Sequence, residues 1–284
     1  WTGDEPVLFP IDCPDFGGFI CSITFIKADT WKVGQLRAGD TVRFHRVSLD
    51  SALASRRRNE AFLQGLASSV ESGSWTDAVP FDSEALGPDV SQSRQDIVAA
   101  LEASDTQPTV TYRAGADDYL LIEYGDGRAD LNHKCRAAAL KTELVNATGA
   151  ISTSRKGGAI YNMVPCGNTL ALWYDGMTLP RATLVYRLLE IENSLGDLRA
   201  FRFPNRHIRL PVTFRHRKLA ETTERYMTNQ RSNASYLPDP FQYVAEMNGM
   251  TAKELKDLFL SVQSVVIAVG FIMALPECNN DALN

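Results

Sequence analysis

Hydrophobic and polar positions alternate near the start of the chain and then take up helical spacing. Residues 19–27, FICSITFIK, are rich in β-branched and aromatic side chains, and residues 41–47 alternate in character, so both stretches predict strands. Residues 50–72 carry apolar side chains near helical spacing, for example Leu53 and Leu66, and predict a helix. Residues 28–36 predict a short helical turn between the two strands. The order strand, short helix, turn, strand is typical of the edge of a β-barrel or sandwich more than of a doubly wound sheet.

A second unit is predicted from residue 109 onward. Short segments of β-branched, aromatic and aliphatic residues predict strands at 109–113, 119–124, 151–153, 159–163 and 169–174. Two longer segments, 131–144 and 179–195, predict helices, and Gly196 lies where the second helix should end. This order of elements predicts a small α+β sandwich with its helices on one face.

A third unit opens with residues 207–214, HIRLPVTF, which alternate and predict a strand, and residues 219–230 predict a helix. In the following YLPDPFQ, Asp239 occupies an N-cap position, a proline comes directly after it, and Gln242 is placed as a capping-box partner. We therefore expect this segment to start a helix and to be chiefly structural.

Residues 71–107 differ from their surroundings because Ser, Gly, Asp and Pro dominate them, so they predict a long surface loop or a domain boundary. A helix-like pattern interrupts this stretch at residues 95–102. The chain is expected to divide into four parts, which are residues 1–50, 51–108, 109–205 and 206–284. The fold class predicted from all these elements is α+β.

Composition narrows the classes of function. The chain has 284 residues, a net charge of −5 and a pI near 5.5, which argues against nucleic-acid binding because that function favours a basic surface. Its five cysteines form no C-x-x-C pair, and no apolar run reaches the roughly 20 residues of a membrane span. We expect a protein of the reducing cytoplasm that does not enter a membrane.

Familiar catalytic motifs are absent from the sequence: there is no phosphate-binding loop, no nucleophile elbow and no H-E-x-x-H, and the four histidines lack metal-ligand spacing. No metal site is predicted. Basic side chains beside apolar strands, namely Lys27, Arg43, His45 and Arg209, are suited to a carboxylate or bicarbonate-like anion. The alternative is that they decorate exposed strand faces. Tyr236 completes the set of candidate substrate-binding residues, and the catalytic residues are left open.

Two separated groups of segments resemble one family. The stretches GGFIC, ADTWKVGQL and AGDTVRFHRV are similar to the end of the allophanate-hydrolase-subunit-2-like half of the urea carboxylase carboxyltransferase domain. DDYLLIEYGDGRADLN, RLPVTF, ERYMTNQRSNASYLPDPFQYVAEMNGM and VVIAVGFIMALP are similar to the subunit-1-like half. The B and C subunits of bacterial 5-oxoprolinase and the kinase-inhibitor accessory proteins resemble the same two halves.

The resemblance implies a fold and a reaction. It implies cyclophilin-like β-barrel pieces, one ending near residue 50 and one from residue 206, around the small α+β domain. It also implies transfer of a carboxyl group from carboxybiotin to urea, giving allophanate, in a fungal-type enzyme. Carboxybiotin would arrive on a carrier domain, because no lysine here adjoins a methionine as in a biotin carrier and no cofactor is expected on this chain itself.

Departures from the family pattern leave alternatives open. The distal barrel motifs of the family are missing, so we expect a piece truncated at both ends that does not carboxylate urea alone. One alternative is a repurposed biosynthetic enzyme acting on a small amide or carboxylate; others are a 5-oxoprolinase-type component and a non-catalytic interaction or regulatory protein. Expected partners are a small anionic or amide substrate, a biotin carrier or partner subunit, and a second copy of the chain, because incomplete barrels expose strand edges.

Overall fold

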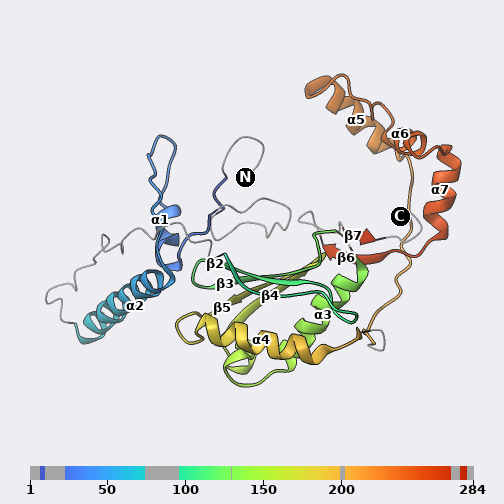
Figure 1. The fold of residues 1–284 in the computed structure, drawn as a ribbon. Coiled ribbons are helices and arrows are strands. Elements are labelled where there is room, and N and C mark those ends of the chain that lie inside the picture. The colour runs from blue at the N-terminus through green and yellow to red at the C-terminus, as the bar shows by residue number, and fades with distance from the viewer. Residues whose placement is uncertain are drawn as a thin grey trace. The chain divides into compact units, whose positions relative to one another are not determined.

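The computed structural model describes residues 7–9, 23–73, 96–128, 130–198, 202–269 and 276–279 (Figure 1). The chain forms two compact units. The first comprises Trp1–Phe201 with Ile267–Glu277, and the second comprises Arg202–Val266 with Cys278–Asn284. Among the described residues, no helix combines the length and the apolar character that crossing a membrane requires.

An antiparallel sheet of five strands forms the centre of the first unit. Its strands are β1 (Ile97–Leu101), β2 (Val110–Gly115), β3 (Tyr119–Tyr124), β4 (Ile160–Cys166) and β5 (Thr169–Tyr174). They lie in the order β1-β2-β3-β5-β4, and every neighbouring pair is antiparallel. Hairpins account for the β2–β3 and β4–β5 neighbours, whereas the pairing of β3 with β5 joins segments about 50 residues apart in the sequence.

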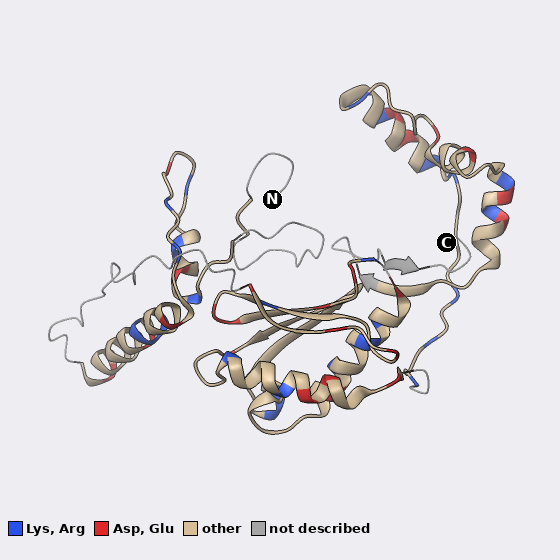
Figure 2. Cartoon of the chain, viewed as in Figure 1, with Lys and Arg blue, Asp and Glu red and all other residues tan. Residues whose placement is uncertain are grey.

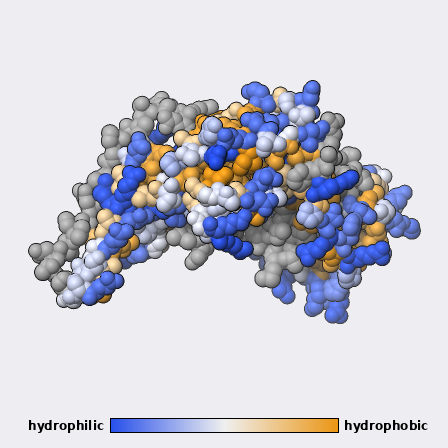
Figure 3. All heavy atoms as spheres, turned by 90° about the horizontal axis from the view of Figure 1, so that it is seen from below, coloured by the Kyte–Doolittle hydropathy of each residue, from blue (hydrophilic) through white to orange (hydrophobic). Residues whose placement is uncertain are grey.

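Two helices cover one face of this sheet, α3 (Leu131–Asn146) and α4 (Arg181–Leu195) (Figure 1). Burial alternates along β2 and β3, as expected when one face of a sheet packs on helices. The core is fully buried and comes from the strands and both helices, with Tyr112, Leu120, Ile122, Tyr124, Leu170, Leu172, Tyr174, Leu140, Leu144, Leu184 and Leu188. On the face seen in Figure 3, hydrophobic residues gather among hydrophilic ones.

Residues 23–73 contribute a short turn η1 (Lys27–Asp29), a one-turn helix α1 (Thr30–Val33) and the long helix α2 (Leu49–Ser72). Ser48 caps α2, because its hydroxyl accepts the backbone N–H of Ser51 at 3.1 Å. The helix ends at Gly73, whose left-handed φ of 66° suits glycine. The predicted helix at 50–72 is therefore confirmed.

In the described residues, the second unit contains three helices, α5 (Arg217–Asn229), α6 (Pro240–Met247) and α7 (Ala252–Ser261). It also contains the start of strand β6 (Val265–Val269), which pairs with β7 (Pro276–Asn279). Phe214 packs against Phe241 and Phe259, with ring centroids 5.3 and 5.6 Å apart. These aromatic contacts join α6 and α7 to the segment before α5.

The capping predictions in this unit are confirmed for Asp239 and corrected for Gln242. Asp239 accepts the backbone N–H of Gln242 at 3.1 Å, with proline directly after the cap. The Gln242 side chain instead contacts Glu246 at 2.9 Å and Arg215 at 3.0 Å, so this capping box is not reciprocal. The box at the start of α7 is complete, because Thr251 and Glu254 bond each other's backbone N–H.

Several predicted elements were wrong. Residues 23–26, 41–47 and 207–214 carry no strand in the structure, and residues 19–22 of the first prediction lie outside the described part. Alternation alone does not make a strand, because a strand also needs a neighbour to pair its backbone groups. Residues 151–153 form the end of a 3-10 turn and one isolated bridge, and 95–102 contain strand β1 where a helix was predicted.

The fold class is mixed helix and antiparallel sheet, as predicted. The main sheet is open in the described residues and is not a closed barrel. The cyclophilin-like character of residues 1–50 and 206–284 stays a prediction, as does the division of the chain into four parts.

Candidate functional site: a polar cluster at the β2–β3 turn

The turn between β2 and β3 has an unusual backbone and two buried acidic residues. Ala116 adopts a left-handed φ of 46°, which is uncommon for a residue other than glycine. Its carbonyl accepts a hydrogen bond from the guanidinium of Arg181, whose Nε lies 3.2 Å from the hydroxyl of Tyr174. These contacts fix the turn to α4 and β5, and Asp117 and Asp118 follow in this held conformation.

Lys27 of η1 contacts both acidic residues. Its backbone N–H donates to Oδ1 of Asp117 at 2.8 Å, and its Nζ lies 3.2 Å from Oδ2 of Asp118. The hydroxyl of Tyr161 on β4 donates to the same Oδ2 at 2.8 Å, and the ammonium of Lys27 lies 5.9 Å from the centre of the Tyr161 ring. Lys27, Asp118 and Tyr161 therefore form one connected group drawn from three distant parts of the sequence.

Asp117 is fully buried, and its Oδ2 has no hydrogen-bond partner in the described structure. Desolvation raises the pKa of Asp117, and the nearby charge of Asp118 acts in the same direction, while the N–H of Lys27 and the charge of Arg56 oppose it. A carboxyl group in this position is held closer to its protonated form than an exposed one.

Helix α2 packs on the cluster through Arg56. Its Nη2 lies 2.8 Å from Oδ1 of Asp175, in the turn after β5, and its Nε lies 3.3 Å from Glu60. Nη1 of Arg56 is buried and, in the described residues, has no partner. A Cβ at Gly176 would collide with the carbonyl oxygen of Asp117, so the two turns approach each other closely because this position is glycine.

The arrangement presents one half-exposed ammonium beside a carboxylate and a phenol. Side-chain exposure is 44% for Lys27 and 12% for Asp118, so the ammonium retains hydrogens free for a ligand while Asp118 fixes its position. Desolvation and the hydrogen bond to Asp118 raise the pKa of Tyr161, which keeps the phenol protonated as a donor. Such a group is able to polarise a carbonyl oxygen or hold a carboxylate.

The predicted site residues occupy different places. Lys27 lies in the cluster, and Arg43 and His45 are exposed in the extended segment that leads to α2. Arg209 is exposed in the extended segment before α5, along which basic residues recur (Figure 2). Tyr236 belongs to the same second unit as Arg209, and its hydroxyl lies 3.4 Å from that of Tyr226. Their roles in substrate binding stay predictions.

Sequence reasoning missed Asp117, Asp118, Tyr161 and Arg56. Arg56 lies in the segment predicted as a helix at 50–72, and the two acidic residues lie between the strands predicted at 109–113 and 119–124, but none of them was singled out as a site residue. The sequence contained one signal, which is the pair of adjacent acidic residues between two predicted strands. Such residues are costly to bury in a short hairpin turn without cationic partners. In the part that the structure describes, no three His, Cys, Asp or Glu side chains gather as a metal site.

Two family models match the chain. The carboxyltransferase domain model for subdomains A and B matches residues 1–46, and that for subdomains C and D matches residues 110–276. The first match contains Lys27 and the second contains Asp118 and Tyr161, so the cluster joins residues from both matched regions.

Relatives agree with these matches. The chain is 42% identical to a putative urea carboxylase of Emericella nidulans over 97% of its own length, and it spans 22% of that protein. It is 36% identical over 59 residues to the C subunit of the 5-oxoprolinase of Haemophilus influenzae, which is 21% of this chain and 19% of that one. The crystal structure of the K. lactis urea amidolyase superposes with a TM-score of 0.62 at 25% identity, covering 89% of this chain and 14% of that chain.

The sequence identity to the Emericella nidulans protein and the share of this chain that the alignment covers are both high. The family model for subdomains C and D matches more than half of the sequence. Both matched regions occur in the order expected from the motifs. The chain belongs to the carboxyltransferase domain family shared by urea carboxylase and urea amidolyase.

Proposed function

We propose that this chain carries the carboxyl-transfer step of a biotin-dependent urea carboxylase, with the Lys27 cluster as its substrate-binding group. The observation that carries the proposal is the half-exposed ammonium of Lys27, held by Asp118 where the two matched regions meet. Because the site takes residues from both regions, it forms only when the two regions fold against each other. This property is expected of a functional site more than of a surface ion pair.

The reaction consumes urea and a carboxyl group delivered on carboxybiotin, which a carrier brings as a substrate. A urea nitrogen forms a bond to the carboxyl carbon, the bond from that carbon to the biotin ureido nitrogen breaks, and the proton from urea ends on that ureido nitrogen. Negative charge develops on oxygen as the carboxyl group moves. An ammonium fixed in advance stabilises such charge without reorganising at the moment of reaction.

Each member of the cluster has a separate task in this proposal. Lys27 donates to the urea carbonyl or to the transferring carboxylate, and Asp118 together with Tyr161 holds the ammonium in place. Arg56 and Asp117 are positioning residues, because Arg56 fixes α2 to the turn after β5 and Asp117 fixes the β2–β3 turn to η1. Arg43, His45, Arg209 and Tyr236 remain candidates for further contacts with an anionic or amide substrate.

The reaction is tested in the longest natural protein that contains this chain, with its carrier region present. We expect ATP-, bicarbonate- and urea-dependent formation of allophanate. We also expect the 284-residue chain alone to form none, because carboxybiotin has to be delivered. Allophanate formation by the purified chain from urea, ATP and bicarbonate would overturn this division of labour.

A 5-oxoprolinase-type activity is the second candidate, and the similarity to a 5-oxoprolinase component over 59 residues favours it. Its substrate is a cyclic amide in place of urea, and the Lys27 cluster would polarise the ring carbonyl. The same preparation is assayed for ATP-dependent opening of 5-oxoproline. Ring opening without allophanate formation would replace the first proposal with the second, and neither activity would favour a non-catalytic interaction protein.

A further inference from the structure

The turn between β2 and β3 carries backbone strain at an alanine. Ala116 has a φ of 46°, a left-handed conformation that costs free energy in any residue with a Cβ and that turns usually give to glycine. Glycine stands one position earlier, at the end of β2 (Gly115). Such a conformation persists only where surrounding contacts hold it, and residues of this kind cluster at functional sites. The contacts that hold Ala116 therefore also set the position of the two acidic residues that follow it.

Arg181, the first residue of α4, supplies the holding contact. Its guanidinium donates to the carbonyl oxygen of Ala116, and its Nε donates to the hydroxyl of Tyr174 at 3.2 Å. The helix itself gains nothing from an arginine at this place, because the positive end of the helix dipole lies at the N-terminus and disfavours a cation. A residue that conflicts with its own element and makes a remote contact is expected where function requires it.

The same contacts reach the carboxylate that holds Lys27. The backbone N–H of Tyr174 donates to the carbonyl oxygen of Asp118 at 2.9 Å, so Tyr174 and Arg181 together fix the turn at both of its ends. The carboxylate of Asp118 meets the ammonium of Lys27 at 3.2 Å and the hydroxyl of Tyr161 at 2.8 Å. A continuous series of contacts thus runs from the start of α4 to the ammonium.

We propose that Arg181 is a positioning residue for Lys27 and acts by holding Ala116 in its left-handed conformation. Without the guanidinium, Ala116 relaxes to an ordinary φ, the turn moves, and Asp118 no longer meets the ammonium. Glycine at position 116 adopts the left-handed conformation readily and lets the turn keep its shape without Arg181. The inference rests on the proposed function for the part that Lys27 plays in carboxyl transfer, but the hold on its ammonium is measured separately.

Acylation of lysine side chains measures whether Lys27 is held. The 284-residue chain is treated briefly with acetic anhydride, and mass spectrometry gives the labelling rate of Lys27 relative to Lys32. Lys32 is a matched reference because it also forms an ion pair, with Asp29 at 2.9 Å. We expect Arg181→Met to raise this ratio about five-fold, since the nitrogen has to leave its carboxylate before it reacts.

Rescue by Ala116→Gly separates positioning from a general loss of structure. Adding Ala116→Gly to Arg181→Met should return the labelling ratio most of the way to the wild-type value, because the turn no longer stores strain. Tyr174→Phe carries the same test if Arg181→Met does not fold, because it removes only the hydroxyl that orients the guanidinium. It should raise the ratio by a smaller factor, and Ala116→Gly should reverse that rise as well.

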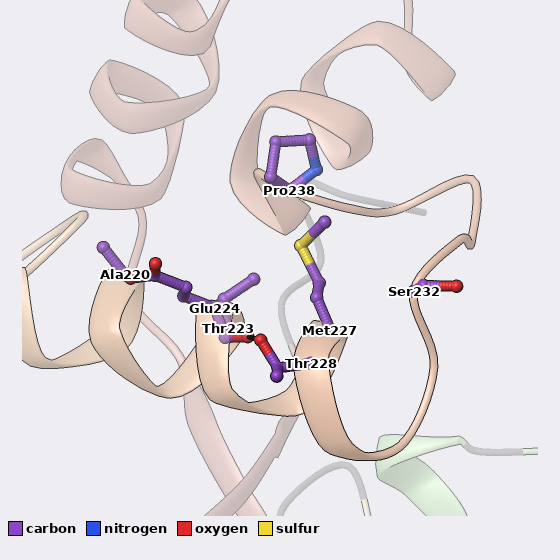
Figure 4. A pocket seen from close by; sticks show the side chains of 7 residues that line it. All are labelled: Ala220, Thr223, Glu224, Met227, Thr228, Ser232 and Pro238. Atoms are coloured by element: carbon purple, nitrogen blue, oxygen red, sulfur yellow. Dashed lines mark hydrogen bonds between the residues drawn. The ribbon is translucent and has the colours of Figure 1, made fainter.

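Two substitutions outside these contacts serve as controls. Arg187→Met removes an exposed ion pair with Glu190 further along α4. Met227→Leu changes the lining of a pocket of about 410 Å³ in the second unit, where Met227 reaches from α5 toward Pro238 (Figure 4). Both substitutions should leave the Lys27 labelling ratio unchanged.

The outcomes separate this proposal from the proposed function. An unchanged ratio in Arg181→Met and Tyr174→Phe, or no rescue by Ala116→Gly, would overturn the positioning role. Urea-dependent loss of labelled carboxybiotin is also timed in the full-length protein, where Arg181→Met should be about ten-fold slower and Ala116→Gly should restore part of the rate. If labelling responds as expected while transfer does not, Arg181 still positions Lys27, and the proposed part of Lys27 in carboxyl transfer fails.

Discussion

At the scale of single residues, Asp117 is strongly altered by its surroundings. Its side chain is fully buried, its Oδ1 accepts the N–H of Lys27, and desolvation raises its pKa above the ordinary value. A raised pKa means that the folded protein binds a proton more readily at this position than the unfolded chain does. Ionisation of Asp117 therefore lowers the free energy of unfolding as pH rises.

Asp117→Asn removes this ionisation and keeps an oxygen that accepts the Lys27 N–H. We expect the stability of the variant relative to wild type to increase as pH rises, beginning near the ordinary Asp pKa of about 3.9 and levelling off above the raised value. Urea-denaturation midpoints of both proteins across this range measure the difference. A difference that decreases with rising pH would show that Asp117 is stabilised as a carboxylate and would contradict the account.

Asp239 supplies a second test at this scale, because its role was predicted from local sequence alone. Its carboxylate caps α6 and lies 2.8 Å from Arg215. Asp239→Ala should lower the free energy of unfolding by about 1 kcal/mol, the usual loss for an N-cap. Asp257→Ala, which breaks an exposed ion pair with Lys253 but no cap, should cost less in the same melts. Equal losses would argue against the capping role.

At the scale of elements, a buried ion pair ties α3 to α4 beneath the sheet. Arg136 and Glu192 are 2% and 0% exposed, and Arg136 also donates to the carbonyl oxygens of Glu192 at 3.1 Å and Gly196 at 2.9 Å. Tyr124 of β3 donates to Glu192 at 2.9 Å, and desolvation raises the pKa of Glu192. The pair therefore joins two helices and a strand at one buried point.

Removing one partner should leave the other charge buried without compensation. We expect Arg136→Met to lower the free energy of unfolding by about 3–5 kcal/mol, the range for broken buried pairs. The matched control is Arg187→Met. Arg187 and its partner Glu190 both lie on α4 and form an exposed ion pair, so this substitution should change stability little. Chemical denaturation followed by circular dichroism measures both. A small loss for Arg136→Met would mean that water or neighbouring groups satisfy Glu192.

Most helices and hairpins were predictable because their signals are local. The caps at Asp130, Asp239 and Thr251 mark helix starts within a few residues of sequence. Strand β1 was mistaken for a helix, because its register is set by pairing with β2, which a short window does not contain. Residues 207–214 gave the opposite error. Their alternating pattern predicted a strand, but no described segment pairs with them.

At the scale of the whole molecule, the candidate site depends on contacts that are remote in sequence. Lys27 and Asp117 are 90 residues apart, and Asp118 and Tyr161 are 43 apart. Lys27 was singled out for its charge beside an apolar stretch, but its partners became visible only when the sheet placed β4 near the β2–β3 turn. Family resemblance predicted the reaction class, whereas the residues that surround the ammonium required the fold.

The most direct test separates carboxyl transfer from the steps that precede it. In the full-length protein, Lys27→Met is compared with Lys32→Met, which removes a nearby lysine paired with Asp29 at 2.9 Å outside the cluster. Labelled carboxybiotin is formed on the protein, and its urea-dependent loss is timed. We expect Lys27→Met to slow this transfer about 100-fold, as loss of a key electrostatic donor does, with biotin carboxylation unchanged and Lys32→Met near wild type. Transfer at the wild-type rate in Lys27→Met would contradict the central claim that this cluster serves carboxyl transfer.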